Sequence, residues 1–132
     1  MSGITLKNGL LINAILTGAT GLLMALFANP VASLLVPGAP AWLIFAIGAA
    51  FVLFAIDVAL IARWKSGSAA LVGFVFLADL AFIIAVPAIL LMMPHAFTAL
   101  GIAASLGVSA IVACFAWIEW QGLQAMSAAN AA

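Results

Sequence analysis

Charge is scarce in this sequence. Of its 132 residues, only 5% are Asp, Glu, Lys or Arg, whereas about a quarter are charged in soluble globular proteins. Three basic and three acidic residues cancel to a net charge of zero. The chain therefore lacks the basic patch through which proteins bind phosphate backbones, and we expect no nucleic-acid partner.

Residues that usually carry catalysis or bind metals are equally rare. There is one cysteine, Cys114, and one histidine, His95. One cysteine forms neither an intrachain disulfide nor a thiol redox pair, and no Ser–His–Asp grouping exists, so only carboxylates remain for acid–base chemistry. We expect no enzymatic activity and no cofactor. Met92 and Met93 offer soft ligands for Cu(I) beside His95, but a fourth ligand is missing, and no metal site is expected.

What the sequence does have is long apolar runs. It is 70% hydrophobic, and its mean hydropathy is +1.47. Four runs, at about 10–28, 41–62, 69–93 and 97–120, are each long enough to cross about 30 Å of hydrocarbon as a helix. They predict an all-α membrane protein in which residues 1–132 form a single domain, an antiparallel four-helix transmembrane bundle.

The connections between the runs differ in character. Residues 29–40 hold three prolines, which stop helices, and predict a loop that lies along the membrane interface. Residues 63–68 are polar and contain the Ser66-Gly67-Ser68 turn. Residues 94–96 are so few that the third and fourth helices must form an antiparallel hairpin.

The basic residues suggest an orientation. Lys7 precedes the first helix, and Arg63 and Lys65 lie in the second connection, so all three fall on one side of the membrane. Cytoplasmic loops carry an excess of Lys and Arg. We therefore expect both termini in the cytoplasm and a multi-pass protein of the cell inner membrane, with residues 29–40 outside.

Asp79 is the residue that most needs an explanation, because it lies near the middle of the third run. An ionised Asp at a helix centre costs about 3 kcal/mol, so an acid at such a depth is a functional candidate. One interpretation is a protonatable group that binds a cation or a hydrogen-bond donor of a ligand. The other is a neutral carboxyl group, hydrogen-bonded to Thr20 or Ser109, that only fixes the register of the helices.

Other polar residues fall at similar depths. Helical rise places them in the cytoplasmic half of the bundle, whereas the outer half is almost wholly apolar. The expected set is Asp79, Asn13, Thr17, Thr20, Ser109 and, nearer the surface, Asp57. This distribution predicts a polar pocket that is accessible from the cytoplasmic side. Glu119, in the last turn of the fourth run, is expected to be a solvated interfacial charge.

Small residues recur every fourth position in the fourth run. Such a ladder lets helix backbones approach closely in a membrane. It consists of Gly101, Ser105, Ser109 and Ala113. A partner membrane protein or a second copy of the chain is one candidate for the helix that packs there, and a helix of the same chain is the other.

Several short strings resemble those of a group of small four-span bacterial inner-membrane proteins. They are Leu10-Leu11-Ile12-Asn13, Gly18 and Gly21, Asn29-Pro30, and Leu77-Ala78-Asp79-Leu80-Ala81. Members of that group begin with an Asn-bearing helix and continue through a Pro-rich loop. The resemblance implies an architecture and no chemistry, because the group has no established activity.

Two functions are compatible with these features. The first is a non-enzymatic binding or accessory protein, embedded in the lipid bilayer, that holds a small amphipathic ligand or a partner helix at the polar cluster around Asp79. The alternative is a proton-coupled small-molecule transporter that works as a homo-oligomer, with Asp79 cycling its proton.

Overall fold

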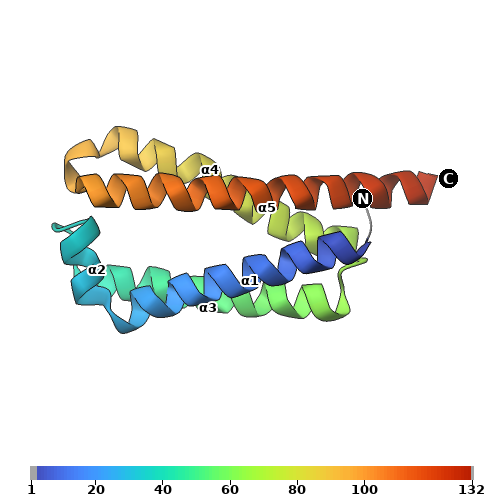
Figure 1. The fold of residues 1–132 in the computed structure, drawn as a ribbon, viewed down its shortest axis with the longest axis horizontal. Coiled ribbons are helices and arrows are strands. Elements are labelled where there is room, and N and C mark those ends of the chain that lie inside the picture. Colours follow the sequence, from blue (N-terminus) through green and yellow to red (C-terminus); the bar gives the residue numbers. More distant parts are fainter. Residues whose placement is uncertain (1–2, 132) are drawn as a thin grey trace.

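The computed structural model describes residues 3–131, and within that range it contains helices and no strand. Figure 1 shows their arrangement. The elements are α1 (Gly3–Leu26), α2 (Ala28–Leu35), α3 (Ala41–Trp64), α4 (Ala69–Met92), the 3₁₀ turn η1 (Pro94–Ala96) and α5 (Ala99–Ala131). The all-α fold expected from the sequence is confirmed, and α1, α3, α4 and α5 are each long and apolar enough to cross a membrane.

The four long helices form two pairs. α1 packs mainly against α3, and α4 packs mainly against α5. Both chain ends lie at one end of the molecule, called the terminal end below, where the connection between α3 and α4 also lies (Figure 1). α2 and η1 lie at the opposite end, the α2 end.

The outer surface of the bundle is strongly apolar. In the most hydrophobic stretch of each long helix, the buried share is 11% for α4 and at most 28% for the others. Large side chains such as Leu91 and Met92 are 84% and 80% exposed. Apolar surface on this scale is stable only against lipid or another apolar partner. The protein is therefore a multi-pass membrane protein.

Helix boundaries differ from the hydrophobic runs in two respects. α1 begins and α5 ends well outside the apolar runs, because hydropathy marks where a helix crosses lipid and says little about where the helix ends. The Pro-rich segment 29–40 also begins with a helix, α2. Pro30 lies in the first turn of α2, where its missing N–H needs no partner, so it starts the helix instead of breaking it.

α1 and α3 cross at two glycines. A Cβ atom on Gly21 would lie 2.6 Å from the Gly48 carbonyl oxygen, and one on Gly48 would lie 2.6 Å from the Gly21 oxygen. Only hydrogen fits between the two backbones at this point. The close approach brings Phe51, on the turn after Gly48, beside α1.

The α2 end is closed by a contact between α2 and the start of α5. The Thr98 hydroxyl donates to the Leu34 carbonyl oxygen at 2.6 Å, and the Thr98 amide donates to the Leu35 oxygen at 3.0 Å. The same hydroxyl accepts a hydrogen bond from the Gly101 amide at 2.9 Å. Gly101 itself lies against the Leu35 carbonyl group, where a larger residue does not fit.

Candidate functional site

Three polar side chains from three different helices meet inside the bundle. Asn13 of α1 donates through Nδ2 to Asp79 Oδ2 of α4 at 2.9 Å and to Glu119 Oε2 of α5 at 3.1 Å. Their exposed fractions are 0%, 4% and 1%, respectively. We call this group the Asn13–Asp79–Glu119 cluster.

Each member of the cluster continues a buried stripe of its own helix. Leu6, Leu10 and Asn13 recur at three- to four-residue spacing along α1, as do Val72, Val75 and Asp79 along α4. Residues at this spacing share one face of a helix. The same apolar contacts that hold the helices together therefore direct these polar groups inward.

Thr17 fixes the orientation of the central amide. Its hydroxyl donates to Asn13 Oδ1 at 2.9 Å, one turn further along α1. An amide oxygen accepts and its nitrogen donates, so with the oxygen occupied by Thr17 both Nδ2 hydrogens are directed at the two acids.

No positive side chain balances the two acids. Lys7, Arg63 and Lys65 are all exposed, and the described residues contribute only Asn13 as a hydrogen-bond donor to the carboxyl pair. Asp79 and Glu119 lie close enough to interact directly. Two negative charges on adjacent buried carboxyl groups repel each other and lack solvation. The pair is therefore more stable when the two groups share one proton.

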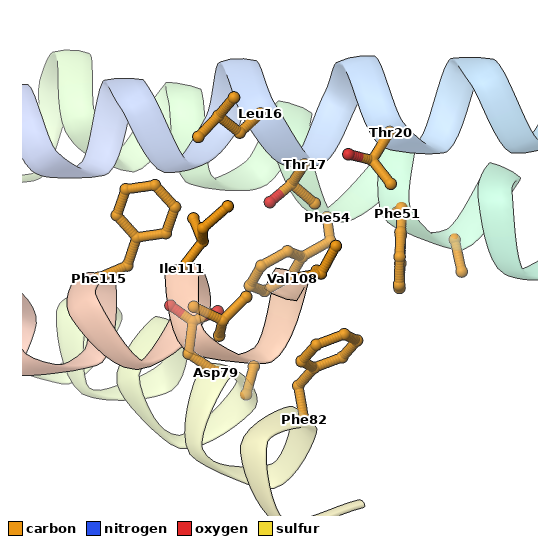
Figure 2. A pocket seen from close by; sticks show the side chains of 13 residues that line it. Leu16, Thr17, Thr20, Phe51, Phe54, Asp79, Phe82, Val108, Ile111 and Phe115 are labelled. Atoms are coloured by element: carbon orange, nitrogen blue, oxygen red, sulfur yellow. The ribbon is translucent and has the colours of Figure 1, made fainter. Parts of the chain in front are cut away.

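A cavity of about 310 Å³ adjoins the cluster and lies between the α1–α3 pair and the α4–α5 pair. Figure 2 shows side chains from all four long helices directed into it. Its polar lining consists of Asp79, Thr17 and Thr20, and its walls are otherwise apolar. Four phenylalanines contribute to these walls, namely Phe51, Phe54, Phe82 and Phe115.

Apolar side chains fill the bundle between the cluster and the terminal end. This core combines residues of α1, α3 and α4, with side chains of α5 packed against it: Leu6, Leu10, Ala14, Val58, Ile61, Ala62, Val72 and Val75. The sequence predicts a pocket that is accessible from the cytoplasmic side, which corresponds to the terminal end. The apolar packing there does not fit such an opening. The cavity lies on the other side of the cluster, between the two helix pairs.

Family models, curated proteins and solved structures were compared with the chain. None of them matches. The resemblance to small four-span proteins rests on the sequence strings given above, and the four long apolar helices agree with that architecture.

The structure brings together four of the six residues expected at the polar site. Asp79, Asn13 and Thr17 are linked by hydrogen bonds, and Thr20 lines the cavity beside them. Asp79 bonds to Asn13, and its expected partners Thr20 and Ser109 form no hydrogen bond with it. Ser109 is buried in α5, and its hydroxyl oxygen has no hydrogen-bond partner in the described chain.

Asp57 is not part of the site. It is exposed on α3 and does not line the cavity, so α3 contributes apolar walls and no polar group. Hydropathy did not predict the direction of its side chain, because apolar residues cover every face of α3 and leave no stripe by which to orient it.

Glu119 is the residue that the sequence reasoning missed, and the expectation of a solvated charge is wrong. It is 1% exposed and accepts a hydrogen bond from Asn13. Spacing gave no usable signal for Glu119, because apolar residues cover every face of this part of α5 and do not show which side turns inward. Position near a helix end suggested solvent, but α5 continues to Ala131 and carries Glu119 within the helix.

The weak metal candidates lie far from the cluster, near the α2 end. Met92 and Met93 are 80% and 55% exposed, and His95 in η1 is exposed as well. Within residues 3–131 no group of three or more His, Cys, Asp or Glu side chains is placed to hold a metal ion.

Proposed function

We propose that this protein is a non-enzymatic binding protein of the inner membrane that holds a small amphipathic ligand in the cavity beside Asp79. The observation that carries the proposal is the position of this carboxyl group, 4% exposed and in the wall of a largely apolar cavity. Small-molecule sites have this composition, with apolar walls and a few convergent polar groups.

The size and location of the cavity favour a small lipophilic molecule. Its volume of about 310 Å³ is at the lower end of the range for small-molecule pockets. The terminal end is packed with apolar side chains, so a ligand arrives from the bilayer, between the two helix pairs. Its polar group meets Asp79, Thr17 and Thr20, and its apolar body lies among the phenylalanines.

A partner helix is less well supported as the occupant. Two of the four ladder residues are already used within the chain, because Gly101 packs against Leu35 and Ser109 is 7% exposed. Ser105 and Ala113 alone remain as small residues through which a partner protein or a second copy would approach α5.

One observation favours the second candidate function, a proton-coupled transporter that works as a homo-oligomer. Asp79 and Glu119 form a buried carboxyl pair without a basic partner in the described chain. Such a pair binds and releases a proton as its surroundings change, and intramembrane acids of this kind form the proton relays of pumps and transporters.

Asp79→Asn tests the binding proposal. An Asn side chain still accepts the hydrogen bond from Asn13, so we expect the variant to fold while it loses the charge that retains the ligand. Native mass spectrometry of the gently purified protein should show a small molecule that co-purifies with the unaltered protein and is depleted at least about tenfold in Asp79→Asn, a loss of about 1.4 kcal/mol.

Asp57→Asn is the matched control, because it makes the same chemical change on the exposed face of α3. Equal ligand occupancy in Asp79→Asn and the unaltered protein would contradict the binding proposal. Uptake into liposomes that depends on a pH gradient and disappears in Asp79→Asn would instead establish the transporter.

A further inference from the structure

The cavity combines a negative pole with aromatic walls. The negative pole is Asp79, and the aromatic side chains come from three helices, α3, α4 and α5. Figure 2 shows Phe54, Phe82 and Phe115 around the space that Asp79 faces. A phenyl face attracts a cation, and it does so more strongly when the cation is desolvated.

The charge of the Asn13–Asp79–Glu119 cluster also favours a cation. Asn13 supplies hydrogen-bond donors but no positive charge. The Oε1 atom of Glu119 is buried and has no partner in the described chain. One proton held by the carboxyl pair leaves it with a single negative charge, and Asp79 is the member of the pair that lines the cavity.

From these two observations we infer that the ligand is a lipophilic monovalent cation, an alkyl or aryl amine or quaternary ammonium, and that it competes with a proton for the Asp79 carboxylate. This inference rests on the proposed function, since it names the class of ligand that the cavity takes. Where Asp79 itself holds a second proton at low pH, the entering cation displaces that proton to solvent and the net charge of the site does not change. Where Asp79 is already ionised, the cation pairs with the carboxylate and no proton leaves.

A neutral or anionic amphiphile fits less well. The polar lining offers the two threonine hydroxyls and a carboxyl group, and no basic side chain reaches the cavity from residues 3–131. An anionic head would lie beside Asp79 without a counter-charge, which is strongly unfavourable in a low-dielectric site. A neutral ligand would contact the apolar walls but would leave the Asp79 carboxylate without a counter-charge.

Few other titratable groups influence this competition. On α1 the titratable side chain is Lys7, on α3 they are Asp57 and Arg63, and all three are exposed. Cys114, on the same helix as Glu119, is also exposed. The pH dependence of cation binding therefore reports the Asp79–Glu119 pair.

Two isosteric probes test the inference on the unaltered protein. Benzyltrimethylammonium is a permanent cation, and neopentylbenzene has the same shape with carbon in place of nitrogen. Each is titrated into the protein in nanodiscs of zwitterionic lipid. Binding is followed through the δ1 methyl resonance of Ile111, which lies in the cavity wall (Figure 2).

We expect the cation to bind at least about tenfold more tightly than the isostere, as one ion pair with cation–π support requires. Its affinity should fall as the pH is lowered, by up to about tenfold per pH unit once the proton holds the site. Asp79→Asn should abolish the preference for the cation, and Asp57→Asn should preserve it.

Each alternative outcome has a separate meaning. Equal or tighter binding of neopentylbenzene, independent of pH, would overturn the cation inference and leave the cavity as a site for neutral amphiphiles. If neither probe shifts the Ile111 resonance, the inference is also overturned. The proposed function then stands or falls with the co-purifying ligand in the native mass spectra.

Discussion

At the scale of single residues, Asn13 uses its amide nitrogen for two acids from different helices. Nδ2 donates to both Asp79 and Glu119, and Thr17 holds the amide oxygen. A side chain without donors at this position would leave two buried carboxyl groups facing each other. Asn13 therefore links α1, α4 and α5 through one side chain.

Asn13→Leu should destabilise the fold by about 1–3 kcal/mol, the cost of leaving buried polar groups unpaired. Thr17→Val is the control, because it removes one neighbouring hydrogen bond and leaves the bonds to the acids, for a loss of about 0.6 kcal/mol. Reversible unfolding in mixed micelles measures both. Equal stabilities of the two variants would show that the cluster contributes nothing through Asn13.

At the scale of helices, the crossing of α1 and α3 defines one wall of the cavity. Gly21 and Gly48 allow the two backbones to approach, and a Cβ on Gly21 would lie 2.8 Å from Phe51 Cβ. Phe51 in turn packs edge-on against Phe82 of α4, with ring centroids 5.9 Å apart. The position of the aromatic wall thus depends on two residues that have no side chain.

Gly48→Val should therefore weaken the pairing of α1 with α3 by about 1–3 kcal/mol, because added atoms meet backbone that cannot move aside. Gly73→Ala is the matched control, since nothing lies within 4 Å of a Cβ at that position of α4. Thermal unfolding of both variants in the same detergent measures the difference. A Gly48→Val protein as stable as Gly73→Ala would show that the helices separate without cost.

At the scale of the whole molecule, the orientation in the membrane is a prediction from charge. Both chain ends and the connection that holds Lys65 lie at the terminal end (Figure 1). The positive-inside rule places that end in the cytoplasm. Gly67 at the terminal end and Gly38 at the α2 end both have open space where a side chain would be added.

These two glycines allow a matched test of orientation in spheroplasts. In a Cys114→Ser background, Gly38→Cys should react with a membrane-impermeant maleimide, and Gly67→Cys should react only after lysis. The reverse pattern of labelling would show that the protein is inserted the other way round.

The sequence by itself determined the class of fold and singled out the acid that lines the cavity. Helical rise and the thickness of a bilayer convert four apolar runs into four spans, and the cost of burying a carboxyl group singles out Asp79. These deductions depend on length and depth along one helix, which the order of residues fixes.

Only the tertiary structure decided which polar groups meet. Apolar residues surround every long helix, so periodicity does not reveal which face turns inward. Packing turns Glu119 into the cluster and leaves Asp57 exposed, although both are acids in the half of the helix that is nearer the terminal end. Packing also fills the terminal end with apolar side chains and places the cavity between the helix pairs, because the contacts that close a bundle join residues far apart in the chain.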